Sequence, residues 1–345
     1  IEYRPLEGFV TAISPFNFTS IGANLPTAPA IAGNVVLWKP ATTAVLSNYY
    51  VMQALMAAGL PAGVINFVPS RGSDMSKYVL SDPNLAGFHF TGSTEVFSGV
   101  YSLVGENIKK YKTYPRLVGE TGGKDFIFAH NSADVPGLVA ALTRASYEYQ
   151  GQKCSAASRA FVPASIWPQV KEGMLAEIEK IKIGDITDFT NLMGAVIDAS
   201  AFKTNKEYID YAKASEDAEV ICGGYDDSKG YFIYPTLIEA KKPDFKTMVE
   251  EIFGPVMTVY VYPDDKLDET LQAAIPQRPM VCPEQSLQMT AKLSLRWKMH
   301  LKEQPETSTS TTSRPVQLSA SSRSVVQEHP EPTTKPAARS TCIAG

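Results

Sequence analysis

Cys154, in the segment QGQKCSAASR, is the residue whose type and setting most directly suggest chemistry. A thiolate is a strong nucleophile, and the small or polar residues from Gly151 to Ser155 leave room for a substrate and for backbone N–H donors. The neighbouring Lys153 would favour the thiolate form. A lone cysteine is more commonly a packing residue of the core, so both interpretations stay open on this segment alone.

Glu120, in LVGETGGK, is the candidate for a general base. An apolar run precedes it and the strand-like DFIF follows it. We therefore expect the carboxylate to be buried and its pKa to be raised, which suits a base. The glycines around it allow the backbone to bend away from standard dihedrals. The alternative is a solvated surface glutamate.

Asn17 lies between two aromatic residues in PFNF, where an exposed amide would be expected to have polar neighbours. An amide N–H held rigidly by packed rings could donate to the negative charge that develops on a carbonyl oxygen. A structural turn is the alternative.

Three residues are candidates for holding a nucleotide. Gly92 and Ser93, in FTGS, follow a predicted strand where a helix could begin, so their backbone N–H groups could face a pyrophosphate. Lys39, in LWKP, ends another predicted strand and could contact ribose hydroxyls, although an isolated lysine is more commonly solvated. The GxGxxG fingerprint of the ordinary Rossmann fold is absent, so these segments alone do not identify a dinucleotide.

The elements that must position these residues alternate between strand-like and helix-like segments. Strands are predicted in FVTAIS, NVVLWKP, VINFVPS, GFHFTGS and DFIFA, and a helix is predicted in SNYYVMQALMAAGL. This alternation is typical of βαβ units on a parallel sheet, which binds ligands where its strands end. We therefore expect an α/β fold with a Rossmann-type parallel sheet in the first part of the chain.

A second α/β region is predicted from Glu120 onward, with helices at 135–149, 167–181 and 201–215 and a strand in PVMTVYVYP. We expect a partial nucleotide-binding domain at 1–119 and a partial catalytic domain at 120–271. Residues 272–345 are rich in Ser, Thr and Pro, so we expect a disordered tail there.

The composition of the chain excludes some classes of binding partner. The 345-residue chain has a formal net charge of −4 and no dense Lys/Arg stripe, so we expect no nucleic acid partner. It has no apolar run of about 20 residues, so we expect no membrane span. Its four cysteines are too widely spaced for a metal-ligand cluster or a disulfide framework. A small molecule is the expected partner.

Seven segments occur in the order and approximate spacing of the aldehyde dehydrogenase superfamily: PFNF, LWKP, GLPAGVINFVP, FTGS, GETGGK, GQKCSA and EEIFGP. The chain resembles this family from Phe9 to about Leu271. The resemblance implies an NAD-dependent oxidoreductase with an NAD-binding domain and a catalytic domain. In it Cys154 attacks an aldehyde and hydride passes to NAD. Asn17 and the Cys154 backbone N–H hold the oxyanion, and Glu120 activates water against the thioester.

The resemblance also implies which residues contact NAD. They are Glu251 and Phe253 at the nicotinamide ribose, Lys39 at the adenine ribose, Gly92 and Ser93 at the phosphates, and Ser14 elsewhere on the cofactor.

The residues of four segments are most similar to those of one branch of the family: GETGGK, GQKCSAASR, EEIFGPV and VYVYPDDK. That branch oxidises L-glutamate gamma-semialdehyde, formed from delta-1-pyrroline-5-carboxylate, to L-glutamate in proline catabolism. Ser155 would contact the substrate in this branch. The resemblance further implies a homo-oligomer and, as in eukaryotic members, the mitochondrial matrix. We expect the chain to be truncated at its start, with any targeting segment upstream of Ile1.

The family pattern stops after Leu271, where a strand, a helix and a Gly-rich loop that binds the substrate's α-carboxylate would follow. Codons for the tail permit, in a neighbouring frame, the run GQQPFGGARASGTNDK, which is similar to that loop. We therefore hypothesise a frameshift just after Leu271, in the gene or in its deduced coding sequence.

Three alternatives stay open. The chain could be another semialdehyde dehydrogenase, since the missing loop is what separates such enzymes. It could be an inactive fragment that only binds nucleotide. It could also be a thiol-dependent hydrolase, in which Cys154 with Glu120 cleaves activated esters without a cofactor.

Overall fold

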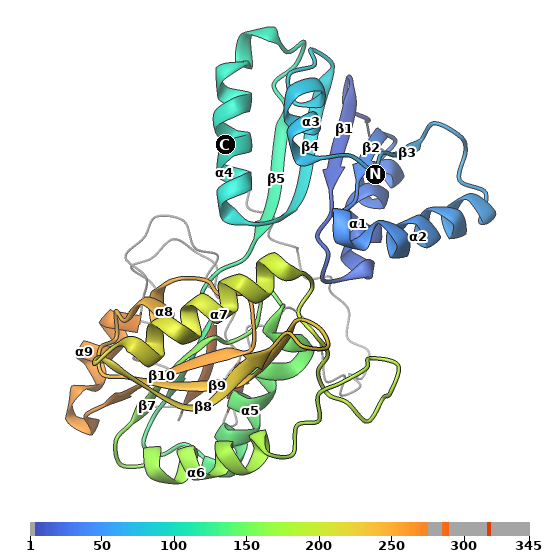
Figure 1. Ribbon diagram of the computed structural model, residues 1–345. Helices are drawn as coiled ribbons and strands as arrows, with labels where there is room; N and C mark the ends of the chain where they lie inside the picture. The colour runs from blue at the N-terminus through green and yellow to red at the C-terminus, as the bar shows by residue number, and fades with distance from the viewer. Residues whose placement is uncertain (1–3, 275–284, 290–315, 319–345) are drawn as a thin grey trace, which may run out of the picture.

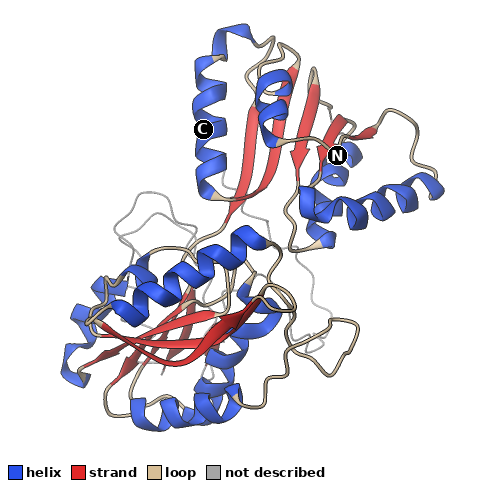
Figure 2. Ribbon diagram, in the orientation of Figure 1, coloured by secondary structure: helices blue, strands red, loops and turns tan. Residues whose placement is uncertain are grey.

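The computed structural model describes residues 4–274 together with the short segments 285–289 and 316–318. Figure 1 shows two lobes, each built on one sheet, and Figure 2 shows the helices packed around each sheet. The first sheet has the strand order β3-β2-β1-β4-β5, and the second has the order β12-β11-β6-β7-β10-β9-β8. The predicted α/β class with a parallel sheet is confirmed.

The first sheet is parallel throughout. Its strands are β1 (Phe9–Ile13), β2 (Val35–Lys39), β3 (Ile65–Phe67), β4 (Leu85–Gly92) and β5 (Arg116–Thr121). The helices of this lobe are α1 (Thr19–Ile31), α2 (Val45–Ala57), the short α3 (Gly72–Asp74) and α4 (Thr94–Glu106).

Apolar side chains alternate across this sheet, so that each face packs against helices. On one face, Phe88 and Phe90 of β4 pack with Phe97 of α4. On the other, Val10 of β1 packs with Leu25 of α1. Burial on both faces explains why these strands read as nearly continuous apolar runs.

The second sheet is parallel at its centre and antiparallel at the β8–β9 and β11–β12 pairs. Its strands are β6 (Phe126–Ala129), β7 (Arg159–Pro163), β8 (Ala218–Asp226), β9 (Phe232–Ala240), β10 (Val256–Tyr262), β11 (Gln285–Met289) and β12 (Val316–Leu318). Its helices are α5 (Val135–Tyr147), α6 (Trp167–Ile178), α7 (Ala199–Ala214), α8 (Lys246–Val249) and α9 (Leu267–Ala274). Helices α5 and α6 share one apolar cluster, and α7 belongs to another.

The strands and helices predicted from sequence patterns are all present, with their ends shifted by a few residues. Helix α1 was not predicted, because Pro26 and Pro29 lie inside it and proline lacks the N–H that a helix interior uses. Glu120 lies inside β5 and not in a glycine-rich bend. The sheet therefore changes between Thr121 and Phe126, and the predicted boundary between 119 and 120 falls within a strand.

Most of the predicted disordered tail, residues 272–345, lies outside the described residues. Three of its residues complete α9, and β11 and β12 are the two short segments described beyond it. In the described part of the chain, no helix is both long and apolar enough to cross a membrane.

Candidate active site

The carboxyl ends of the strands of the first sheet bring together residues that the sequence analysis selected. Ser14 follows β1, Lys39 ends β2, Gly92 ends β4 and Glu120 lies one residue before the end of β5. Because neighbouring strands are parallel and in register, these ends lie at the same edge of the sheet. Ligands of open α/β sheets bind at this edge.

Ser14 and Lys39 are both buried at this edge, with 2% and 7% of their surface exposed. Ser14 Oγ accepts a hydrogen bond of 2.9 Å from Trp38 Nε1, and Lys39 Nζ donates one of 3.0 Å to Pro40 O. Burial lowers the pKa of Lys39. A hydroxyl can also donate, and an ammonium has three donors, so both groups keep hydrogen-bonding capacity for ribose hydroxyls.

Ser93 is the N-cap of α4, and its Oγ accepts a hydrogen bond of 3.3 Å from Val96 N. The expectation that a helix begins after FTGS is therefore confirmed. The first backbone N–H groups of a helix have no acceptor within the helix, and they lie at the positive end of its dipole, so the amino end of α4 suits a phosphate.

The loop that carries Cys154 connects α5 to β7, and the cysteine side chain is partly buried. Three successive residues before it have left-handed backbone dihedrals, with φ of 60° at Tyr149, 57° at Gln150 and 62° at Gly151. A Cβ on Gly151 would lie 2.4 Å from the backbone oxygen of Gly254, so only glycine fits there. The loop that carries Cys154 is thus packed directly against the EEIFGP segment.

Two glutamine side chains fix the same loop from another side. Gln150 Oε1 accepts a hydrogen bond of 3.2 Å from Gly194 N, and Gln152 Oε1 accepts one of 3.1 Å from Ile197 N. Lys153 does not serve as a free cation beside the thiol, because its Nζ lies 2.6 Å from Glu148 Oε2. The expectation that Lys153 promotes the thiolate therefore loses support.

Asn17 is buried, with 5% of its surface exposed, and it reaches the loop of Cys154. Its Nδ2 donates a hydrogen bond of 3.0 Å to Gln152 O, and its own backbone oxygen accepts one of 2.6 Å from the Tyr149 hydroxyl. These bonds join the loop between β1 and α1 in the first lobe to the loop of Cys154 in the second. An amide nitrogen has two N–H donors, and the bond to Gln152 O uses one of them.

Two further predicted residues come from EEIFGP. Phe253 has a φ of 57°, and its ring packs edge-on against Phe16 of PFNF with centroids 5.9 Å apart. Glu251 reaches the GETGGK segment: its carboxylate accepts a hydrogen bond from the Gly123 backbone. Burial raises the pKa of Glu251, and the nearby Lys124 counters this rise.

Glu120 is exposed, so the expectation that it is buried is wrong. Enough protein surrounds the carboxylate for desolvation to raise its pKa, as predicted for a general base. Ser155 follows Cys154 directly in the loop and is partly buried.

Lys124 is a buried cation that the sequence analysis did not single out. It is 6% exposed, and its Nζ has no hydrogen-bond partner in the described residues. Burial, followed by the charge of Arg159, lowers the pKa of Lys124 to about 7. A lysine after two glycines gives no sequence signal of burial, and the charges that act on it, Arg159 and Glu251, lie far away in the sequence.

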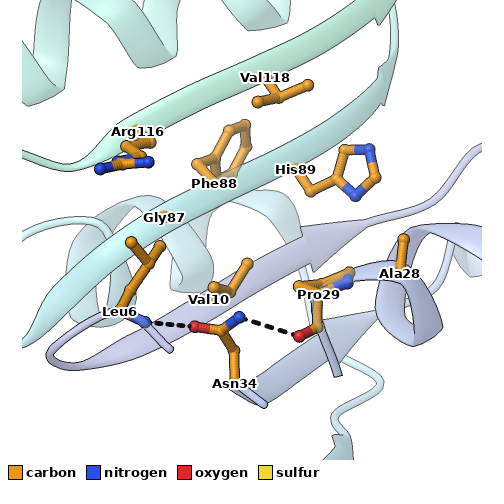
Figure 3. Close-up of a pocket in the computed structure, with 10 residues that line it drawn as sticks. All are labelled: Leu6, Val10, Ala28, Pro29, Asn34, Gly87, Phe88, His89, Arg116 and Val118. Carbon is orange, nitrogen blue, oxygen red and sulfur yellow. Dashed lines mark hydrogen bonds between the residues drawn. The ribbon is translucent and has the colours of Figure 1, made fainter. Parts of the chain in front are cut away.

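A pocket in the described residues lies on the first sheet but not at this edge (Figure 3). Val10, Gly87 and Arg116 line it from the amino-terminal halves of β1, β4 and β5. Asn34 also lines it, and its Oδ1 accepts a hydrogen bond of 2.8 Å from Leu6 N. None of the predicted site residues lines this pocket, so it is separate from the candidate active site.

A parallel sheet with polar groups at its strand ends is thus joined, through the buried Asn17, to a loop that carries a cysteine. The sequence model of the aldehyde dehydrogenase family matches residues 1–274, and the chain belongs to this family.

Several proteins that are similar to this chain in sequence have the same name. The chain is 55% identical over 275 residues to "Delta-1-pyrroline-5-carboxylate dehydrogenase, mitochondrial" of Dictyostelium discoideum, covering 79% of this chain and 49% of that protein. It is 52% identical over 272 residues to the human protein of the same name, covering 78% of this chain and 48% of that protein. The chain therefore spans about half the length of the curated relatives it matches.

Solved structures agree in fold. The Delta-pyrroline-5-carboxylate dehydrogenase from Mycobacterium tuberculosis, solved bound with NAD, matches with a TM-score of 0.74 and 52% identity over 78% of this chain and 49% of that one. A 1-pyrroline-5-carboxylate dehydrogenase from Thermus with bound NAD matches with a TM-score of 0.74 and 29% identity, covering 85% of this chain and 56% of that one.

Proposed function

We propose that this chain carries the cofactor-binding and catalytic core of an NAD-dependent dehydrogenase that oxidises L-glutamate gamma-semialdehyde to L-glutamate. The observation that supports this most directly is the hydrogen bond from Asn17 Nδ2 to Gln152 O. It ties the candidate oxyanion donor to the loop of the candidate nucleophile, across 135 residues of sequence.

The proposed chemistry assigns one task to each of three residues. The Cys154 thiolate attacks the aldehyde carbon, and the second amide N–H of Asn17, with the Cys154 backbone N–H, donates to the oxygen that becomes negative. After oxidation to the thioester, Glu120 takes a proton from a water molecule, which attacks the acyl carbon and releases the carboxylic acid. Sulfur leaves as the thiolate, so Cys154 is regenerated.

NAD, when bound, supplies the acceptor for the aldehyde hydride. The residues at the edge of the first sheet fit this cofactor in their chemistry, because Lys39 is a buried donor and the amino end of α4 offers backbone N–H groups. Lys39 would hold the adenine ribose, Gly92 and Ser93 the phosphates, and Glu251 with Phe253 the nicotinamide ribose. Ser14 would contact the cofactor between them.

The substrate assignment rests on the names of the relatives, which identify them as delta-1-pyrroline-5-carboxylate dehydrogenases. Ser155 would contact this substrate beside Cys154. Another semialdehyde dehydrogenase remains the second candidate, because the family match ends at residue 274 and the predicted carboxylate-binding loop lies beyond it. Oxidation of a shorter or longer semialdehyde at a higher kcat/KM would favour that candidate.

We also propose that the reading frame changes just after Leu271. The family match continues only to residue 274, which supports this position. Sequencing the gene and its transcript across this point tests the proposal: one uninterrupted frame that encodes the printed tail would exclude it.

We further propose that the intact protein is a homo-oligomer of the mitochondrial matrix. Relatives of this chain are named as mitochondrial, which supports a location in this organelle. Light scattering of the frame-restored protein and organelle fractionation test the two statements separately.

The deciding experiment measures NADH formation from NAD and glutamate gamma-semialdehyde. It compares the chain as printed with a chain whose frame is restored after Leu271, each with a Cys154→Ala control. If only the chain with the restored frame forms NADH, the result supports the proposed function. The chain with the sequence given above is then an inactive form. No turnover by either, in folded protein that binds NAD, contradicts the substrate assignment. Ester hydrolysis that Asn17→Ala leaves unchanged, in protein that does not bind NAD, would indicate a hydrolase.

A further inference from the structure

Tyr149 connects the two loops that carry Asn17 and Cys154. Its hydroxyl donates a hydrogen bond of 2.6 Å to the backbone oxygen of Asn17, 132 residues away in sequence. Its ring stacks on Phe18, with centroids 5.3 Å apart and planes 7° from parallel. Tyr149 thus contacts two successive residues of the PFNF segment.

The backbone of Tyr149 is held in a conformation that L-residues disfavour, with a φ of 60°. Gln150 has a similar φ of 57° and is anchored by its bond to Gly194 N. Left-handed dihedrals at two successive non-glycine residues persist only where surrounding contacts over-determine them. In this conformation the Tyr149 ring stacks on Phe18 of the first lobe.

Asn17 is consequently fixed at both ends. Tyr149 holds its backbone oxygen, and Gln152 O holds one hydrogen of its side-chain amide. Both partners belong to the short segment that precedes Cys154. The direction of the second amide hydrogen is therefore set relative to the thiol by the nucleophile loop itself.

We propose that Tyr149 is a positioning residue, whose hydroxyl fixes Asn17 so that its side-chain amide can stabilise the oxyanion formed at Cys154. This inference rests on the proposed function, because it assigns a support to the Asn17 role. The hydroxyl of Tyr149 bonds to Asn17 and its ring stacks on Phe18, so its proposed effect on the reaction passes through Asn17.

The test uses the full chain and p-nitrophenyl acetate, without NAD. The Cys154 sulfur forms a bond to the acyl carbon, the ester C–O bond breaks and p-nitrophenolate leaves, through a tetrahedral oxyanion. Alkylation of Cys154 by iodoacetamide, followed by mass spectrometry of the Cys154 peptide, is the comparison, since displacement of iodide forms no oxyanion. Tyr149→Phe keeps the stacked ring and removes only the hydroxyl.

We expect Tyr149→Phe to slow acylation of Cys154 roughly 5- to 20-fold, as the loss of one supporting hydrogen bond would, and to leave alkylation unchanged. Asn17→Ala should slow acylation about 100-fold, as the loss of an oxyanion donor does. Tyr149→Phe should add no further slowing in the Asn17→Ala background. Tyr111→Phe is the matched control, because the Tyr111 hydroxyl also donates to a backbone oxygen, that of Leu80, within the first lobe.

The outcomes separate the two proposals. Acylation slowed by Asn17→Ala but not by Tyr149→Phe overturns the role of Tyr149 alone. Equal slowing of acylation and alkylation by Tyr149→Phe also overturns it, because a loosened loop would affect both reactions. Absence of Cys154 acylation both in the full chain and in the chain whose frame is restored after Leu271 overturns the proposed function together with this inference.

Discussion

Gly122 lies against the carboxylate of Glu251, so closely that a Cβ on residue 122 would be 2.0 Å from Glu251 Oε1. The contact joins GETGGK at the end of the first sheet to EEIFGP of the second lobe. Since Glu251 is the proposed ligand of the nicotinamide ribose, a glycine at 122 sets where that carboxylate lies.

Gly122→Ala should displace the Glu251 carboxylate and weaken NAD binding about tenfold, as a misplaced ligand group would. Gly122 is not among the residues with positive φ, so alanine fits its backbone and stability should change by less than about 1 kcal/mol. Titration calorimetry with NAD measures the first effect and thermal unfolding the second. Gly105→Ala, at a glycine with open space around it, is the control. Unchanged NAD affinity in Gly122→Ala would argue against the role of Glu251.

Gly151→Ala should destabilise the fold, because the atom that its Cβ would meet belongs to the backbone and cannot move aside as a side chain can. A Cβ there would lie 2.4 Å from Gly254 O, and the residue has a φ of 62°. Strained dihedrals and overpacking add, so we expect a loss of about 2–4 kcal/mol in folding free energy. Urea unfolding measures this, and a loss below about 1 kcal/mol would mean that the two loops can separate without cost.

Lys124 should make stability depend on pH in a predictable direction. Its pKa is lowered from 10.5 to about 7, first by burial and then by the charge of Arg159. Between these values the unfolded chain binds a proton that the folded chain does not, so the contribution of Lys124 to stability falls as pH falls through this range. It is constant below about 7, where both states are protonated.

Lys124→Met removes this titration. The melting temperature of the variant minus that of the unmodified protein should therefore increase as pH is lowered from 10.5 to about 7. Lys109→Met, at an exposed lysine, should show no such trend. A difference for Lys124→Met that is the same at all pH values would show that folding leaves the pKa of Lys124 unchanged.

Glu120 should set the acid limit of thioester hydrolysis. Desolvation raises its pKa above the ordinary value of 4.5, and a general base acts only when deprotonated. Hydrolysis of the acetyl thioester on Cys154 should therefore fall with decreasing pH at a midpoint above 4.5. Glu120→Gln should abolish this limb and slow hydrolysis roughly 100- to 10,000-fold, while acylation continues. Rapid thioester hydrolysis in Glu120→Gln would assign the base to another residue.

The strands of the first sheet were predictable because each is a local pattern: a short β-branched and aromatic run that ends before a helix. Helix α1 was not, since Pro26 and Pro29 oppose a helix locally and packing against β1 overrides them. The burial of Glu120 was mispredicted for a related reason. Apolar neighbours in sequence alternate across a strand, so they do not bury the residue between them.

By itself, the sequence determined the α/β class, the order of the motifs and the residue types able to act as nucleophile, base and oxyanion donor, because these depend on short segments. Tertiary structure alone decided that Asn17 bonds to Gln152, that Tyr149 holds Asn17 and that the Lys124 side chain is buried with no hydrogen-bond partner for its Nζ in the described residues. These facts join segments as many as 135 residues apart, and only the packing of one lobe against the other determines which groups meet.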